Sequence, residues 1–388
     1  MKANNTRVVY LDNAATTKVN REALYAMKPY FDQFYGNPSS IYEFGMISKN
    51  AMENGRQILA KMINCEPEEI YFTSGGTESD NWALNGIAFG NYHRGKHIIT
   101  TAIEHPAVKN TCAYLKKYGF QITYIDVDRD GVVNLNQLQS AIRRDTILIS
   151  VMTANNEIGT IQPIEEIGEI ARRKHIIFHT DAVQAFGHLP IDVKKWNVDL
   201  LSVSSHKFGG PKGVGCLYIK KDTEIIPFMN GGHQEQGMRA GTGNVTGVAG
   251  MCGAAKYAWE NMENIRNYEI MLRDYMIRRL LKEVPDCHLN GHASKRLPGN
   301  INLSFDYVDG ASLLVLLDMK GICVSTGSAC SAGENEPSQV LKAIGLSDEQ
   351  AYGSIRITLS AENTREEIDY TIEKIKESVQ ELRKKMTK

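Results

Sequence analysis

The sequence predicts an α/β protein with a large, mainly parallel sheet and a smaller α+β unit. Between Glu69 and Ile219, short apolar runs rich in isoleucine and valine alternate with helical patterns. This alternation is typical of a sheet that helices cover on both faces. After about Ala255 the alternation ends. A chain of 388 residues is also too long for one simple core, so we expect two units.

The larger unit is expected to contain seven strands, each a short apolar run between turns or helical patterns. One of its helices, over residues 164–173, carries Ile164, Ile167 and Ile170 on a single face. Another is expected over residues 77–88. The expected strands span residues 70–73, 97–100, 121–125, 147–152, 176–180, 200–204 and 216–219.

The smaller unit is expected to begin with a long amphipathic helix over residues 262–281. Residues 301–305 and 354–359 then alternate between apolar and polar side chains like half-exposed strands. Thr364 and Glu367 fit a capping box at the start of a final amphipathic helix. We expect a large domain over residues 13–260, and a small α+β domain formed by residues 1–12 and 261–388.

Charge and hydropathy exclude several classes of protein. The net charge is -1, whereas a dedicated nucleic-acid binder shows a clear basic excess. The polar stretch Met1 to Arg7 lacks the apolar core of a signal peptide. Asp318 interrupts the apolar run that ends at Leu317, and no run is long enough to span a bilayer. We therefore expect a cytoplasmic protein with no membrane or direct nucleic-acid partner.

The cysteines do not form the pattern of a disulfide framework. Their number is odd, they lack close pairs, and no C-x-x-C motif suggests a zinc or thioredoxin-type site. We expect reduced thiols, most of them buried as small apolar residues, and we expect no metal site. The seven are Cys65, Cys112, Cys216, Cys252, Cys287, Cys323 and Cys330.

The first candidate for a functional segment is a strand-to-helix turn at residues 73–79, with Gly75 and Gly76 at its centre. A helix N-terminus offers free N–H groups and a positive dipole end, which suit a phosphate group. An ordinary capped turn would explain the same residues, and on its own it is the simpler interpretation. The segment lacks the Gly-Lys-Ser/Thr ending of a nucleotide P-loop.

Two further strand ends carry residues suited to a bound cofactor. Asp181 closes a very apolar strand, and Lys207 follows another buried strand and precedes a glycine-rich turn. In isolation, Asp181 is equally well explained as a turn cap and Lys207 as a surface charge. Ligands bind at the carboxyl ends of strands in doubly wound sheets. A phosphate site, a cation-holding aspartate and a Schiff-base lysine together are what pyridoxal 5'-phosphate (PLP) requires.

His105 and Cys330 are candidates for chemistry beside this site. His105 follows an apolar strand and precedes Pro106, so it is either a proton-transferring residue against a planar ring or a helix cap. Cys330 lies in a small, polar segment without periodicity, which predicts a loop. A thiol in such a loop is either a functional nucleophile or a surface cysteine without a role. We expect Cys323, in an apolar run, to be buried.

Arg356 and Asn156 are candidates for binding a substrate carboxylate. Arg356 lies within an alternating strand, and its fork would fit a carboxylate. A structural ion pair explains Arg356 equally well.

Taken together, these segments resemble the class V, fold-type I PLP enzymes, and specifically the NifS/IscS-type cysteine desulfurases. The resemblance runs from residues 10–17 through Gly36-Asn37-Pro38-Ser39-Ser40 to the final helix. Its most specific parts are Ser204-Ser205-His206-Lys207 and Gly327-Ser328-Ala329-Cys330, in this order. Tyr42 and Gly243 depart from residues common among the relatives, and neither belongs to the core chemistry.

The resemblance implies a role for each matching residue. Lys207 would carry PLP as a Schiff base, Asp181 would pair with the pyridine nitrogen, and His105 would stack on the ring. Cys330 would be the thiol that accepts sulfur. The other implied contacts are Gln184 to the ring oxygen; Gly76, Thr77, Ser204 and His206 to the phosphate; Thr242 to the phosphate of a partner subunit; Asn156 to the cofactor and, with Arg356, to the substrate carboxylate.

The implied reaction converts L-cysteine to L-alanine and leaves sulfur as a persulfide on Cys330. The expected partners are L-cysteine, a second copy of the chain, and a sulfur acceptor such as an iron–sulfur scaffold or a tRNA-thiolation enzyme. Two alternatives stay open. One is a related enzyme such as a selenocysteine lyase or another class V lyase or transaminase, and the other is a non-catalytic sulfur carrier.

Overall fold

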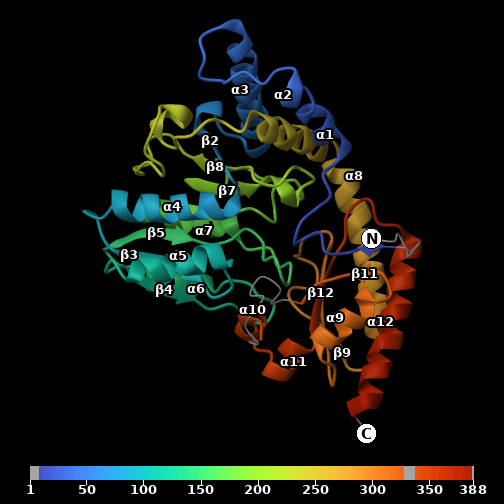
Figure 1. The fold of residues 1–388 in the computed structure, drawn as a ribbon. Coiled ribbons are helices and arrows are strands. Elements are labelled where there is room, and N and C mark those ends of the chain that lie inside the picture. The colour runs from blue at the N-terminus through green and yellow to red at the C-terminus, as the bar shows by residue number, and fades with distance from the viewer. Residues whose placement is uncertain (1–7, 327–336, 387–388) are drawn as a thin grey trace.

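A seven-stranded sheet forms the centre of the larger part of the molecule (Figure 1). The computed structural model describes residues 8–326 and 337–386. Strands β4, β3, β5, β6 and β7 run parallel, whereas β8 is antiparallel to both of its neighbours, so the sheet is mainly parallel as predicted. The order β2-β8-β7-β6-β5-β3-β4 joins β2 (Ile70–Thr73), β3 (His97–Thr101), β4 (Gln121–Ile125), β5 (Thr146–Ser150), β6 (Ile177–Asp181), β7 (Leu200–Ser204) and β8 (Gly215–Ile219).

Helices cover both faces of this sheet, and each face has its own apolar cluster. On one face, Trp82 and Val108 pack against sheet residues such as Leu148. On the other, Leu59 and Met251 belong to the same cluster as buried sheet residues. The first face carries α4 (Gly76–Gly90) and α5 (Pro106–Lys116); the second carries α3 (Glu43–Ile63), α6 (Leu135–Ala141), α7 (Ile164–Arg173) and the first part of α8 (Val245–Glu283).

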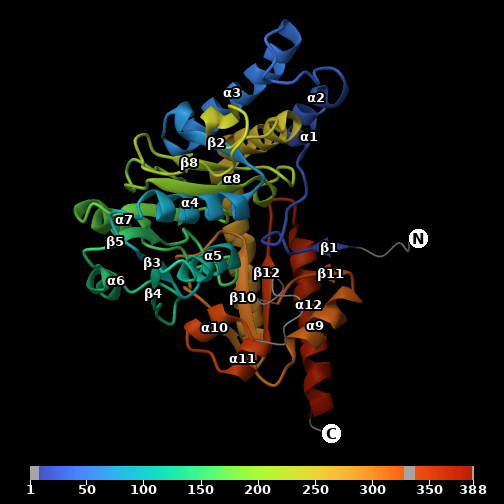
Figure 2. The same cartoon turned by 60° about the vertical axis from the view of Figure 1, so that its left-hand side comes forward.

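The second part of the molecule contains a three-stranded antiparallel sheet in the order β12-β10-β9. One face of this sheet packs on the end of α8 and on two further helices, through residues such as Leu272, Leu303 and Ile372 (Figure 2). The N-terminal strand β1 pairs in parallel with β11 in this part. The elements are β1 (Val9–Tyr10), β9 (Cys287–Leu289), β10 (Asn300–Phe305), α9 (Gly310–Asp318), β11 (Ile322–Cys323), α10 (Gln339–Ala343), α11 (Asp348–Tyr352), β12 (Ser354–Thr358) and α12 (Arg365–Met386).

Helix α8 links the two parts, and it begins well before the helix expected at residue 262. Its first turns are rich in glycine and alanine, which weakens the helical signal in the sequence. These small residues allow α1 (Arg21–Met27) to pack closely, because a Cβ added at Gly253 would lie 2.7 Å from the Glu22 carbonyl oxygen. The helix runs without interruption through residue 260, and the domain boundary at that residue stays a prediction.

The prediction that β10 and β12 are half exposed is wrong, because every residue of both strands is buried. The alternation is real, but the polar face packs against the loop after β5 instead of facing water. Asn300 and Asn302 each donate a side-chain hydrogen bond to the Glu157 carbonyl at 3.2 Å. The two parts of the molecule therefore meet through a buried polar layer.

The capping box is confirmed, because Thr364 and Glu367 exchange side-chain to backbone hydrogen bonds at the start of α12. The cysteines at described positions are free, as predicted, but Cys323 is half-buried rather than buried, because the two-residue strand that holds it lies at the edge of a two-stranded sheet. Among the described residues, no helix is long and apolar enough to cross a membrane.

We predict that Asn302→Leu lowers the free energy of unfolding by about 1–3 kcal/mol, because the leucine would leave the Glu157 carbonyl without one of its donors. If Asn302 were half exposed, as the sequence predicted, the same substitution would change the free energy of unfolding little. The exposed Asn136→Leu is the matched control. Equilibrium urea unfolding measures both changes, and equal stability of the two variants would contradict a buried polar layer.

Candidate active site

The predicted phosphate, aspartate and lysine segments meet at one edge of the large sheet. Strands β6 and β7 are parallel neighbours, and Asp181 pairs in register with Ser202 near their carboxyl ends. Lys207 lies at the end of the short 3-10 helix that follows β7, over Ser205–Lys207. The structure therefore brings together residues that are far apart in the sequence.

The start of α4 is shaped for an anionic group. Gly75 is its N-cap residue and has a φ of 152°, which favours glycine, and no described side chain accepts from the N–H groups of Gly76 and Thr77. A Cβ at Gly76 would lie 2.6 Å from Cγ2 of Val183, so a larger residue could not fit there without movement. The Ser204 side chain flanks the same turn. Uncapped N–H groups and the positive end of the helix dipole therefore face a position beside Ser204.

The Lys207 amine points toward the N-terminal segment of the chain. Its Nζ donates to the carbonyl oxygens of Ala14 at 2.6 Å and Ala15 at 2.9 Å. The Gln184 amide also donates to the Ala14 oxygen, at 3.1 Å. Nε2 of the half-buried His188 lies 3.1 Å from the Lys207 carbonyl oxygen. The loop before α1 thus holds Lys207 and Gln184 next to each other.

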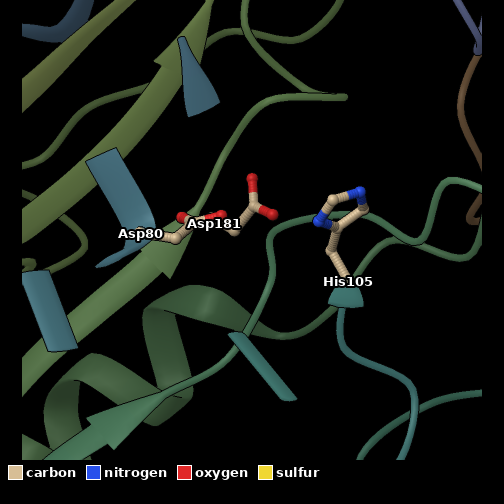
Figure 3. A group of neighbouring side chains, drawn as sticks. All are labelled: Asp80, His105 and Asp181. Atoms are coloured by element: carbon tan, nitrogen blue, oxygen red, sulfur yellow. The ribbon is translucent and has the colours of Figure 1, made fainter. Parts of the chain in front are cut away.

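Asp181 and His105 face each other across the site (Figure 3). His105 is the N-cap of α5, where its Nδ1 accepts from the Ala107 N–H at 3.1 Å. Burial lowers the pKa of His105, and it raises the pKa of Asp181, against the opposing effects of His105 and Lys207. The two interpretations of His105 are thus compatible, because one ring nitrogen caps a helix while the ring faces the site.

His206 and Thr242 occupy different surroundings. Burial, with the Lys207 and Lys212 charges, lowers the pKa of His206 to about 4, so its imidazole is neutral at pH 7. Its Nδ1 lies 3.1 Å from the Thr16 hydroxyl. Thr242 is exposed, in a segment that an Arg239–Glu78 ion pair ties to α4. No hydrogen bond that the structure describes joins Thr242 to the residues around Lys207.

Arg356 is almost fully buried and makes a structural ion pair. Its Nη2 lies 2.8 Å from Oδ1 of Asp12, and its Nη1 donates to the Asn156 carbonyl at 3.2 Å. Its Nε is buried without a partner among the described residues. The structural alternative for Arg356 is therefore present, and the unused donor leaves the carboxylate-binding role as a prediction.

Cys330 lies outside the described residues. Ser325, shortly before it in sequence, exchanges backbone hydrogen bonds with Arg356 of β12. The chain therefore enters the undescribed segment from a position beside Arg356.

A layer of buried polar residues beneath Asp181 was not predicted from the sequence. Asp80 on α4, His179 on β6 and Glu104 before α5 are each at most 3% exposed. The period-two spacing of His179 and Asp181 places both on one face of β6, and this was the available signal. Asp80 and Glu104 come from other segments, and only the fold brings them here.

Comparison with known proteins places this geometry in a family. The sequence profile of class-V aminotransferases matches residues 9–371. The chain belongs to the class-V aminotransferase family. It is 55% identical over 377 residues to a protein of Methanosarcina thermophila named "Cysteine desulfurase IscS", covering 97% of this chain and 93% of that protein. A protein of the same name from Dictyoglomus turgidum is 52% identical, with 97% and 96% covered.

Solved structures agree with this assignment. A "NIFS-LIKE PROTEIN" superimposes with a TM-score of 0.91 and 40% identity, covering 96% of this chain and all of that one. A structure titled "SspA in complex with cysteine" gives a TM-score of 0.82 and 36% identity, with 92% and 99% covered. The predicted fold class and the recognition as a NifS/IscS-type member of the class-V family are confirmed. Members of this family are PLP-dependent in general.

We predict that Glu104→Gln flattens the pH dependence of stability. Burial raises the pKa of Glu104 from 4.5 to about 8, so the folded chain keeps a proton that the unfolded chain releases. The free energy of unfolding must then fall as the pH rises through this window, by about 1 kcal/mol per pH unit. A glutamine side chain keeps an oxygen that accepts from the Thr101 hydroxyl and the Met152 N–H, but it does not titrate.

Urea unfolding of the wild type and Glu104→Gln at several values between pH 5 and pH 8 measures this difference. Glu68→Gln, at an exposed site, is the control. Parallel stability curves for the wild type and Glu104→Gln would mean that Glu104 is ionised in the folded protein.

Proposed function

We propose that this protein is a cysteine desulfurase that holds PLP on Lys207 and receives the sulfur of L-cysteine as a persulfide on Cys330. The observation that carries the proposal is the meeting of Lys207, Asp181 and the uncapped start of α4 at one sheet edge. The names of the relatives and the cysteine complex of one of them support the substrate.

The residues at this edge fit PLP. The glycine turn at Gly75 and Gly76 offers free N–H groups for the phosphate, with Ser204 beside it. Thr77 in the first turn and His206 would add phosphate contacts. The Asp181 carboxylate would pair with the pyridine nitrogen, Gln184 would contact the ring oxygen, and His105 would lie on the ring.

When bound, PLP would supply an electron sink for the charge that develops at the substrate Cα. The Lys207 amine, once substrate has displaced it, would remove the Cα proton. The Cys330 thiolate would attack the substrate sulfur, so that a S–S bond forms while the C–S bond breaks. A proton returned to the three-carbon product completes L-alanine. His105 would exchange the proton of the substrate thiol.

Arg356 and Asn156 would hold the substrate carboxylate. The carboxylate of Asp12 already lies against Arg356, so a bound substrate would share this guanidinium with it. The buried and unpartnered Nε is the donor that Asp12 leaves unused.

We predict that Cys330→Ala lowers alanine and sulfide formation from L-cysteine by about a hundredfold or more, because no acceptor thiol remains for the sulfur. The yellow colour of the bound cofactor should persist in this variant. Cys65→Ala is the control, since burial strongly raises the pKa of that thiol and makes it a poor nucleophile. Normal sulfide release by Cys330→Ala would instead favour a lyase without a persulfide, such as a selenocysteine lyase.

The Schiff base has its own test. Lys207→Ala should lose the absorbance of the Schiff base, whereas Lys212→Ala, at an exposed position nearby, should keep it. A colourless wild-type protein that does not take up PLP would favour the non-catalytic sulfur carrier.

A second copy of this chain is the proposed structural partner. Large apolar side chains are exposed along α1, along α2 (Pro29–Asp32) and before α3. Ile41 is 95% exposed and Phe31 67% exposed. Apolar surface that gathers in this way is typical of an interface. Thr242 would reach the phosphate of the partner subunit in such a dimer. An iron–sulfur scaffold or a tRNA-thiolation enzyme remains the proposed sulfur acceptor, and a cytoplasmic location stays a prediction.

We predict that Phe31→Asp combined with Ile41→Asp weakens dimerisation at least about tenfold, because charges would be buried at the interface. Size-exclusion chromatography with light scattering over a dilution series measures the change. Tyr307→Asp, at an exposed aromatic residue of the other part of the molecule, is the control. A double variant that dimerises like the wild type would place the interface elsewhere.

A further inference from the structure

Asp80 lies directly behind Asp181, on the side away from His105 (Figure 3). One carboxylate oxygen each from Asp80 and Asp181 and one ring nitrogen of His105 all lie within 4.8 Å of one another. Asp80 is 1% exposed and Asp181 5% exposed. Two carboxyl groups this close and this deeply buried cannot both be ionised, so one of them keeps a proton.

The groups around the two carboxyls favour ionisation of Asp181 over ionisation of Asp80. Its Oδ1 accepts from the Val183 N–H at 2.9 Å, and both His105 and Lys207 stabilise its ionised form. Asp80 has weaker support, a hydrogen bond with the Ser202 side chain. Its Oδ1 is buried without a hydrogen-bond partner among the described residues, and burial together with the Asp181 charge raises its pKa well above the ordinary value.

The groups that face Asp80 come from every element around it. Strand β6 contributes Asp181 and His179, and β7 contributes the Ser202 hydroxyl. Glu104, from the segment before α5, adds a further acidic group that disfavours charge on Asp80, and His105 lies beyond Asp181. Among residues 8–326 and 337–386, the basic side chain in contact with Asp80 is therefore the imidazole of His179.

His179 does not neutralise Asp80. Its Nε2 lies 3.6 Å from Oδ1 of Asp80, and closer hydroxyls occupy both ring nitrogens: Ser202 at 3.0 Å and Ser150 at 2.9 Å. Burial lowers the pKa of His179 to about 3, so the ring is neutral at physiological pH. Asp80 thus has acidic and neutral neighbours and keeps its proton.

We propose that Asp80 is a positioning residue, a neutral carboxylic acid that lets Asp181 carry the single negative charge facing the site. The inference rests on the proposed function, in which an ionised Asp181 pairs with the pyridine nitrogen of PLP. An ionised Asp80 would repel that charge and draw a proton onto Asp181, which would remove the pairing. The uncharged Asp80 fills the space behind Asp181 and keeps water from it.

The protonation of Asp80 can be measured on the full chain without cofactor. Infrared difference spectra of the wild type against Asp80→Asn at pH 7 should show the loss of one protonated-carboxyl band. Glu104→Gln is the matched control, because it removes a different buried protonated acid and should lose a separate band of its own while the Asp80 band stays in place. If Asp80→Asn instead removes only a carboxylate band, Asp80 is ionised and the proposal is wrong. This result does not depend on whether PLP is the cofactor.

The positioning role is measured on the PLP-loaded protein. Asparagine imitates a neutral acid, so Asp80→Asn should keep the Kd for PLP within about twofold and the pH titration of the Schiff-base absorbance unchanged. Asp80→Ala opens the space behind Asp181 and should raise the Kd about tenfold or shift that titration by about one pH unit. A shifted titration in Asp80→Asn, or wild-type behaviour of Asp80→Ala, would overturn the role. Failure of the wild type to bind PLP would contradict the proposed function alone.

Discussion

A carboxylate at the end of a buried parallel strand needs compensation, and the arrangement around Asp181 depends on this requirement. Burial raises the pKa of Asp181 and so disfavours its charged form. The Val183 N–H, His105 and Lys207 oppose that effect from three segments of the chain. The parallel sheet makes the convergence possible, because the carboxyl ends of neighbouring strands lie at one edge. The helix N-terminus of α4 adds a further positive end beside them.

The second part of the molecule completes the site with a polar face. Strands β10 and β12 present the buried side chains of Asn300, Asn302 and Arg356 toward the loop after β5, where they donate to the Glu157 and Asn156 carbonyls. Asn155 fixes that loop, because its oxygen accepts from the N–H groups of Glu157 and Ile158 and its amide donates to Ile103. The same contacts therefore hold the two parts together and set the position of Asn156 next to Arg356.

The sequence was most informative where one segment decides its own structure. The strands of the large sheet are continuous apolar runs, so most of their ends could be predicted within one or two residues. The polar face of β10 could not be distinguished from a solvated face, since alternation does not say what covers each side. The first half of α8 was missed because its glycines weaken the helical pattern, and their purpose lies in the contact with α1. Asp80 could not be assigned to the site, because a lone aspartate on a helix gives no sign of the strand against which it packs.

The surroundings of Lys207 become clear only in the folded structure. After a buried strand it is one of many lysines, and the sequence alone also allows a surface charge. In the structure its amine lies against the Ala14 and Ala15 carbonyls, its own carbonyl is held by His188, and Gln184 shares the Ala14 oxygen. The segment that precedes α1 thus fixes the lysine through its amine. Asp12 in that segment also pairs with Arg356, so one short stretch of chain positions both the amine and the guanidinium. A displacement of residues 12–15 would therefore move both groups together, which couples the proposed attachment point of the cofactor to the proposed binding site of the substrate carboxylate.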